Sequence, residues 1–174
     1  MYKLGLSLLL VMALAACGFT PLYATKDSGI LPSEDKEVIA ETSKIYVEPI
    51  ANRLGQIMRQ SLVTQFSPRV TSEKEYSLTV TNRRTLYSEQ GIRKDSVPTR
   101  IIIGYTAYYT LKKGDAVLLK DSAFAQSSYN ILPSGYSTVT TKEAVERQII
   151  LQLSQNIALR VTAFLKKRLI NDEK

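Results

Sequence analysis

The sequence predicts an α+β fold in which two helices pack on a mostly antiparallel four-stranded sheet, in the element order β-α-β-β-β-α. The first observation is the strict alternation of polar and apolar residues at 76–81, which is typical of a strand with one buried face. The second is the helical spacing of apolar residues at 52–66 and again beyond residue 140, which indicates amphipathic helices. Helices with one apolar stripe and a sheet with one apolar face bury those surfaces against each other as two layers.

A short strand and a helix begin the predicted domain, which covers residues 45–174. The strand 45–48 ends at Pro49, because proline has no backbone N–H to donate to a neighbouring strand. Asn52 is suited to cap the helix that follows, and Pro68 ends it because the residue before a proline disfavours helical geometry.

Three strands are expected next, as an antiparallel meander joined by one long connection and one tight turn. The segments are the strand 76–81 with an extension toward residue 87, the connection 89–99, the strand 100–112, the turn 113–115 and the strand 116–129.

Strand parity separates the tyrosines of the predicted strand 100–112. Tyr105 and Tyr109 alternate in step with Ile103 and Leu111, so their face is expected to be the core. Tyr108 has the opposite parity. Because a tyrosine combines an apolar ring with a polar hydroxyl, it suits a half-buried sheet or a partner's surface. We expect core packing for most of the tyrosines and a partner contact for Tyr108.

A long helix ends the chain and covers the sheet. Thr140 and Glu143 have the spacing of a capping box, which predicts that this helix begins there and continues to about residue 169. Leu151 and Leu159 fall outside its apolar stripe and form a second surface, for which either the first helix or another protein is the partner. Arg160 lies within the stripe and is expected to extend past the sheet edge. The stripe itself contains Val145, Ile149, Ile150, Leu153, Ile157, Val161 and Phe164.

The composition excludes several kinds of chemistry. The 174-residue chain has a net charge of +7, no histidine and one cysteine. Histidine catalysis, a Cys/His zinc site, an iron–sulfur cluster and an internal disulfide are therefore ruled out. No phosphate-binding glycine loop and no Gly-x-Ser-x-Gly elbow occurs. Acidic residues gather at 27–37, in a segment that reads as a solvated linker. We expect no catalytic residues, no metal and no cofactor.

The N-terminus predicts a lipid anchor. Residues 1–16 contain a single charged side chain and a short apolar run, as in a secretory signal peptide, and the run is too short to span a bilayer. Leu14-Ala15-Ala16-Cys17 resembles the bacterial lipobox, in which the cysteine carries the acyl chains; the alternative is a free or buried thiol. Gly18 in place of aspartate favours the outer membrane over retention in the inner membrane. Residues 17–44 then read as the lipidated N-terminus and a tether.

Basic residues are expected to gather at one end of the sheet. Arginine binds phosphate through a planar fork of donors, so the group suits a phosphorylated ligand. The alternative is ordinary strand-edge and loop charge that opposes aggregation. Nucleic acid is disfavoured by the expected compartment. The candidate phosphate ligands are Arg83, Arg84, Arg93, Lys94 and Arg100.

The mature N-terminus Cys17-Gly18-Phe19-Thr20-Pro21-Leu22-Tyr23, followed by the order β-α-β-β-β-α, resembles the lipopolysaccharide (LPS)-assembly lipoprotein family in its alphaproteobacterial form. The resemblance implies a palmitoylated outer-membrane lipoprotein that faces the periplasm and the lumen of the LPS-translocating β-barrel. It further implies that the protein plugs that barrel, helps it assemble and contacts LPS without catalysis. No family motif covers the basic residues. The alternative is an auxiliary lipoprotein of an ABC-type lipid transport system; a lipid-anchored periplasmic hydrolase lacks a catalytic set.

Overall fold

A computed structural model describes residues 33–66, 73–92, 98–131 and 135–172. The chain divides into a unit of residues 1–36 and a unit of residues 37–174, and all packing discussed here lies within the second unit. Its elements, in chain order, are α2 (Ser33–Ser43), β1 (Ile45–Val47), α3 (Asn52–Phe66), β2 (Tyr76–Ile92), β3 (Pro98–Lys113), β4 (Ala116–Asn130) and α4 (Gly135–Asp172). The predicted signal peptide, Cys17 and the residues that resemble the lipoprotein family lie outside the described residues.

The sheet is four-stranded and mixed, with the spatial order β1-β2-β3-β4. β2, β3 and β4 form the expected antiparallel meander, whereas β1 pairs parallel to β2 over three residues. β2 and β3 are longer than predicted and leave only residues 93–97 between them, so much of the expected connection 89–99 is strand. The α+β class and the predicted order from β1 to α4 are confirmed.

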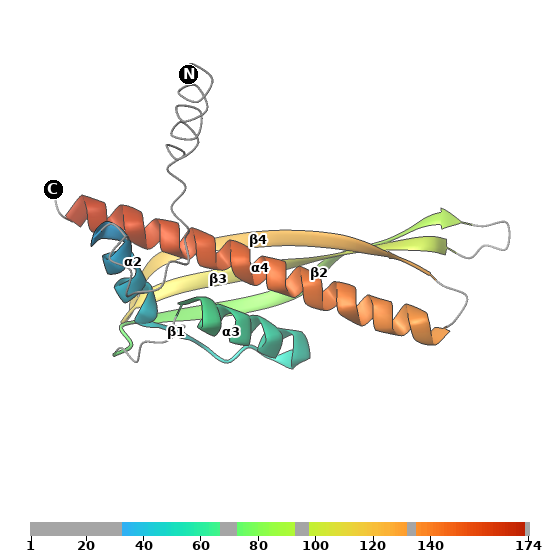
Figure 1. Cartoon of the computed structure of the whole chain (residues 1–174), viewed down its shortest axis with the longest axis horizontal. Helices are drawn as coiled ribbons and strands as arrows, with labels where there is room; N and C mark the ends of the chain where they lie inside the picture. Colours follow the sequence, from blue (N-terminus) through green and yellow to red (C-terminus); the bar gives the residue numbers. More distant parts are fainter. Residues whose placement is uncertain (1–32, 67–72, 93–97, 132–134, 173–174) are drawn as a thin grey trace, which may run out of the picture. The chain divides into compact units, whose positions relative to one another are not determined.

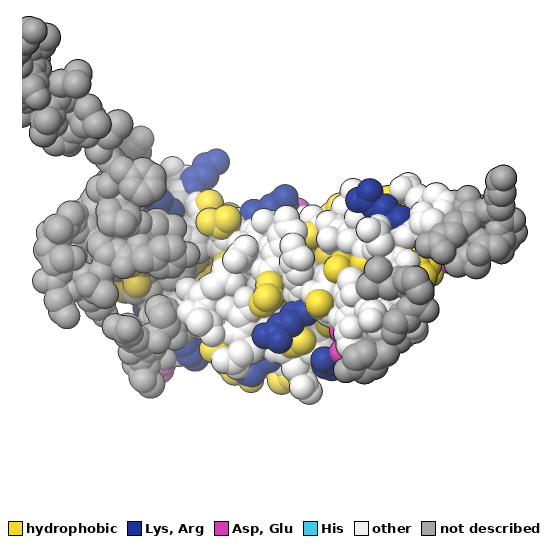
Figure 2. All heavy atoms as spheres, turned by 45° about the vertical axis from the view of Figure 1, so that its right-hand side comes forward, with side chains coloured by type: hydrophobic (Ala, Val, Ile, Leu, Met, Phe, Trp, Pro, Cys, Tyr) yellow, Lys and Arg dark blue, Asp and Glu magenta, His cyan; other side chains and the backbone are white. Residues whose placement is uncertain are grey.

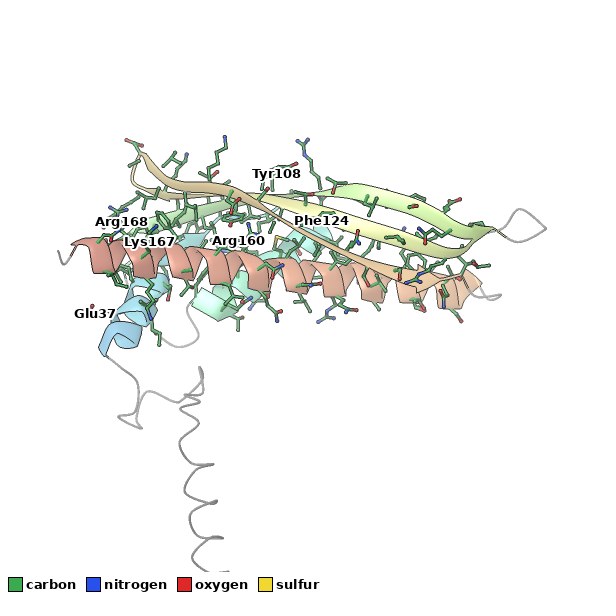
Figure 3. The ribbon with its side chains drawn as sticks, turned by 90° about the horizontal axis from the view of Figure 1, so that it is seen from above. Glu37, Tyr108, Phe124, Arg160, Lys167 and Arg168 are labelled. Atoms are coloured by element: carbon green, nitrogen blue, oxygen red, sulfur yellow. The ribbon has the colours of Figure 1, made fainter. Side chains whose placement is uncertain are left out.

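Both long helices lie on the same side of the sheet (Figures 1 and 3). On that side the alternate residues of β3 are buried, including Tyr105 and Tyr109, while Tyr108 is half exposed on the other side. The predicted division of the tyrosines is therefore confirmed. The fully buried core joins α3, β2, β3 and α4 through Met58, Leu62, Leu78, Ile103, Leu111, Ile149, Ile150, Leu153, Ile157 and Val161.

The apolar stripe of α4 is confirmed, but its predicted start is wrong. The helix begins at Gly135, so Thr140 lies inside it and donates a hydrogen bond to the Ser137 carbonyl at 3.1 Å. Thr141 donates to the same carbonyl at 2.7 Å. A threonine hydroxyl that bonds back to the preceding turn is tolerated within a helix, so a capping-box spacing does not by itself fix the first residue. Within the described ranges, no helix has the length and apolar character that crossing a bilayer requires.

The expected tether 17–44 contains a third helix, so the prediction of two helices is wrong. The part of α2 within the domain is held by side chains far away in the sequence: Tyr76 donates its hydroxyl to the Glu41 carboxylate, and Val38 is buried. Lys44 follows the helix and forms ion pairs with Glu41 at 2.9 Å and with Glu75 at 2.7 Å. The contacts from Glu75 and Tyr76 join residues far apart in the sequence, which explains why the local polar composition did not reveal the helix.

Gly55 marks the closest approach of α3 to the chain before it. A β-carbon at this position would lie 2.6 Å from Ile50 Cγ2 and 3.0 Å from the Ile50 carbonyl group, both inside normal contact distance. Alanine is favoured over glycine in helices by about 1 kcal/mol, whereas overpacking a buried site costs about 1–3 kcal/mol.

We therefore expect Gly55→Ala to lower the free energy of unfolding by up to about 2 kcal/mol, the difference between these two effects. Urea unfolding followed by circular dichroism measures it. Gly135→Ala is the matched control, because nothing lies within 4 Å of a β-carbon there, and it should be neutral or slightly stabilising. Equal stability of the two variants would contradict the close approach of α3.

The ion pairs of Glu75 make the stability of the fold depend on pH. Hydrogen bonds from Lys113 and Lys44 lower the pKa of its carboxyl from 4.5 to about 2. Because this pKa is lower in the folded state, the carboxylate stabilises the fold above pH 4.5, and its contribution declines as the pH falls from 4.5 toward 2. Glu75 is partly exposed, so salt screens the contribution.

We expect Glu75→Gln to lower the melting temperature at pH 7 in low salt, with the difference from wild type vanishing near pH 2 and shrinking in high salt. Thermal unfolding across this pH range measures the effect. Glu73→Gln is the matched control: Glu73 is exposed, and no ion pair to it is found among the described residues. A difference in melting temperature between the two variants that stays constant from pH 7 to pH 2 would contradict a stabilising role for the ion pairs of Glu75 with Lys44 and Lys113.

Candidate interaction surface

The side of the sheet opposite α3 and α4 is not covered by any described element, and its side chains are mainly polar with a few aromatic rings. Tyr108 and Phe124 are about half exposed there, at 51% and 50%, and Tyr46 of β1 lies on the same side. Threonine and serine occupy many of the remaining positions. We name this side the open face; besides the three rings it contains Thr79, Thr81, Arg83, Leu86, Arg100, Ile102, Gly104, Thr106, Thr110, Lys112, Lys120, Ser122, Gln126 and Ser128.

The open face is basic. Strand register places Arg83, Arg100, Lys112 and Lys120 on it. Glu48 is the carboxylate found on the described part of this face, and it accepts a hydrogen bond from Thr79 at 2.9 Å. A surface with more cations than anions attracts an anionic ligand or partner.

Phe124 is held against the sheet although half of it is exposed. A β-carbon on Gly104 would lie 2.9 Å from two atoms of the Phe124 ring and 3.1 Å from the Leu86 β-carbon, so the ring covers this glycine. Leu86 reaches the open face because a β-bulge between Arg84 and Leu86 shifts the register of β2 against β3. The result is a small apolar group of Leu86 and Phe124 over Gly104, within a polar surface.

The five predicted basic ligands do not form one group. Arg83 pairs with Thr106 on the open face, whereas Arg84 pairs with Tyr105 on the helix side. Arg100 lies on the open face about 20 Å along β3 from Thr106, at ~3.3 Å per residue, and its guanidinium donates to Ser128 Oγ at 2.6 and 3.0 Å. Arg93 and Lys94 lie outside the described residues. The prediction that the basic residues gather at one end of the sheet is wrong, because the β2–β3 hairpin is longer than predicted. Arg83 and Arg84 therefore lie near the middle of β2.

The second predicted contact surface lies on α4. Leu159 is 63% exposed, while Leu151 is half-buried. Next to Leu159, Arg160 was predicted to extend past the sheet edge, but it bonds to β4: it donates to Asp121 Oδ2 and to the Ser122 carbonyl, both at 2.9 Å. Figure 3 shows the arginine between the helix and the sheet.

Arg160, Asp121 and Tyr109 join α4 to the sheet. The Tyr109 hydroxyl donates to Asp121 Oδ2 at 3.1 Å, and the Ser122 backbone N–H donates to Oδ1 at 2.7 Å. The Ser122 N–H and then Arg160 lower the pKa of the Asp121 carboxyl, while burial and then the Asp121 hydrogen bond raise the pKa of Tyr109 to about 12. These partners fix Arg160 in a structural role, so it is not available as a phosphate ligand.

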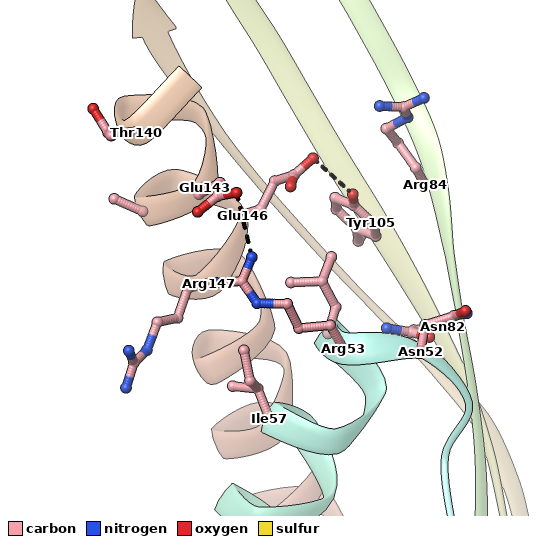
Figure 4. A pocket seen from close by; sticks show the side chains of 12 residues that line it. Asn52, Arg53, Ile57, Asn82, Arg84, Tyr105, Thr140, Glu143, Glu146 and Arg147 are labelled. Atoms are coloured by element: carbon pink, nitrogen blue, oxygen red, sulfur yellow. Dashed lines mark hydrogen bonds and ion pairs between the residues drawn. The ribbon is translucent and has the colours of Figure 1, made fainter. Parts of the chain in front are cut away.

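A groove on the helix side was not expected from the sequence. It lies between the start of α3, the first half of α4 and the middle of β2 and β3, with a volume of about 660 Å³ (Figure 4). Arg53 and Glu143 form an ion pair at 3.3 Å, and the Tyr105 hydroxyl donates to Glu146 at 3.1 Å. The signal that could have revealed the groove is Arg84 itself, a charged residue in line with the buried row Tyr76, Leu78 and Val80.

The described side chains do not form a metal site, because no three histidine, cysteine, aspartate or glutamate residues come together in the part of the chain that the structure covers. The face in Figure 2, turned by 45° from Figure 1, shows basic and hydrophobic side chains in small separate groups among polar atoms. The side chains of both surfaces can make hydrogen bonds, charge interactions and aromatic contacts.

No protein-family model matches the chain, and no curated protein is detectably similar in sequence. Similarity is found among solved structures. A Caulobacter crescentus protein provisionally described as a lipoprotein aligns with a TM-score of 0.59 and 19% identity, over 76% of this chain and 97% of that one.

Two further structures share the fold. Rare lipoprotein B from Shewanella oneidensis aligns with a TM-score of 0.54 and 9% identity, over 75% of this chain and 98% of that one. An uncharacterized lipoprotein B from Nitrosomonas europaea aligns with a TM-score of 0.54 and 13% identity, over 70% of this chain and 83% of that one. At these identities the likeness establishes a common fold, and all three proteins are described as lipoproteins.

Proposed function

We propose that this protein is an outer-membrane lipoprotein, anchored through Cys17, that plugs and helps assemble an LPS-translocating β-barrel and contacts LPS. The observation that carries the proposal is the open face: one side of the sheet, which no described element covers, presents polar, basic and aromatic side chains. The lipobox-like sequence and the fold shared with proteins described as lipoproteins support the anchor.

The open face has the properties that a barrel plug requires. The interior of a transmembrane barrel is polar, so a protein that fills it needs a rigid body with a polar exterior. The threonine and serine hydroxyls can bond to polar lumen side chains, and Tyr108 and Phe124 supply the aromatic contacts that are enriched at protein interfaces. Arg83 and Arg100 are suited to the phosphates of LPS. The role is one of binding, and we assign no catalysis.

Detergent extraction and affinity purification of the full-length protein test the partner. We expect a large outer-membrane β-barrel to co-purify. Recovery of a lipid-transport permease or its binding protein would instead support the auxiliary role in an ABC-type system and contradict this proposal.

Substitutions on the open face test the surface itself. The double variant Tyr108→Glu and Phe124→Glu should reduce recovery of the barrel by about tenfold or more, because charge replaces two aromatic contacts. Val139→Glu is the matched control, since Val139 is similarly exposed, at 57%, but lies on α4. Leu159→Glu tests the α4 surface independently. Normal recovery with the double variant, while its melting temperature is unchanged, would contradict docking through the open face.

LPS binding is tested by reversing charge at two arginines of the same surface. Arg83→Glu together with Arg100→Glu should weaken LPS binding by about tenfold or more and reduce its dependence on salt, because each arginine makes charge-assisted hydrogen bonds. Equilibrium binding at two ionic strengths measures both effects. Wild-type affinity and salt dependence would show that neither arginine contacts LPS phosphate.

A further inference from the structure

The groove on the helix side is a second candidate site, separated from the open face by the sheet. Its lining comes from α3, β2, β3 and α4, so its shape depends on the tertiary fold and not on one loop. Its volume of about 660 Å³ is within the range of small-molecule sites. Figure 4 shows Arg84, Tyr105 and Glu146 on one side of it, and Asn52 and Asn82 on another.

Arg84 is the unusual residue of the groove. The residues before it on the same side of β2 change from buried Leu78 and Val80 to half-buried Asn82 and then to exposed Arg84. Within the described chain, Arg84 has no carboxylate within 4.0 Å, and its recorded contact is the ring of Tyr87, 5.7 Å from the guanidinium carbon. Its fork of N–H donors is therefore open to an oxyanion.

The carboxylates of the groove are already engaged. Glu143 pairs with Arg53, and Glu146 accepts the Tyr105 hydroxyl bond. Burial, with Glu146 next, raises the pKa of Tyr105 to about 12, so the tyrosine keeps its proton at neutral pH and continues to donate. The remaining lone pairs of Glu146 can accept hydrogen bonds from ligand hydroxyls.

The two asparagines add paired donors and acceptors. Asn52 has a left-handed backbone with φ of 72°, a conformation that asparagine tolerates better than most residues. It stands at the first residue of α3, and no hydrogen bond to the side chain of either Asn52 or Asn82 is recorded in the described structure. Amide groups that face a groove in this way suit a ligand rich in hydroxyls.

We propose that this groove binds a small hydroxylated oxyanion of the sugar-phosphate or sugar-acid class. Arg84 holds the phosphate or carboxylate, while Asn52, Asn82 and Glu146 hydrogen-bond to hydroxyls. The inference does not depend on the proposed role of the open face, because the two surfaces lie on opposite sides of the sheet.

The experiment titrates the full-length protein in detergent with glucose 6-phosphate, followed by calorimetry and by the NMR signals of the asparagine side-chain amides. We expect saturable binding that shifts the signals of Asn52 and Asn82. Arg84→Gln should weaken binding by about tenfold or more, the effect of losing charge-assisted hydrogen bonds. Arg83→Gln is the comparison variant, one residue away on the open face, and should leave the ligand-induced shifts of the Asn52 and Asn82 amide signals unchanged.

Other probes distinguish the two sources of the oxyanion and test the hydroxyl contacts. Glucuronate in place of glucose 6-phosphate separates a carboxylate from a phosphate, and tighter binding of either one supports the proposal. Glucose alone and inorganic phosphate alone should each bind more weakly than the combined ligand. Asn82→Ala should weaken glucose 6-phosphate binding but not inorganic phosphate binding, and it gives a second readout if Arg84→Gln perturbs folding.

The proposal is overturned if none of these probes gives saturable binding, if the two arginine variants behave alike, or if inorganic phosphate binds as tightly as the sugar phosphate. Its failure is distinguishable from failure of the proposed function, because barrel recovery and LPS binding are measured on open-face variants. Loss of sugar-phosphate binding in Arg84→Gln with normal barrel recovery would support both assignments.

Discussion

The two-residue alternation of β3 is the constraint on which the rest of the structure depends. This strand lies in the interior of the sheet and pairs along most of its length with both β2 and β4, so its side chains can face only the two sides of the sheet. One side carries Ile101, Ile103, Tyr105, Tyr109 and Leu111, which α3 and α4 bury. Both long helices pack on that side, and no element in the described part of the chain covers the other side.

The β-bulge in β2 determines how the two sides differ. Without the extra residue, Leu86 would continue the inward row begun by Tyr76 and Leu78. The bulge turns Leu86 toward Phe124 on the open face and places the half-exposed Tyr87 on the helix side, next to Arg84. One irregular position therefore adds an apolar contact to the open face and an aromatic neighbour to the arginine of the groove.

Most of the fold could be predicted from the sequence because its main elements have regular periods. The helical spacing at 52–66 and the stripe of α4 correspond to buried faces, and the parity of β3 predicted which tyrosines are buried. What could not be predicted depends on contacts between distant residues. α2 is held by the hydrogen bond between Glu41 and Tyr76, which are 35 residues apart. The positions of Arg83 and Arg84 depend on the length of the β2–β3 hairpin, which no local sequence pattern defines.

The separation of Arg83 from Arg84 shows why a cluster in sequence is not yet a site. Both arginines are adjacent and basic, and both suited a phosphate ligand from composition alone. In the folded chain their guanidinium groups emerge on opposite sides of the sheet, so one ligand cannot use both. Arg83 then lies beside the aromatic rings of the open face, with Arg100 on the same side but farther along β3, and Arg84 shares its environment with the asparagines and glutamates of the groove. The same substitution at Arg83 or at Arg84 changes the net charge of the protein equally. A difference in ligand binding between the two variants would therefore show which side of the sheet the ligand occupies.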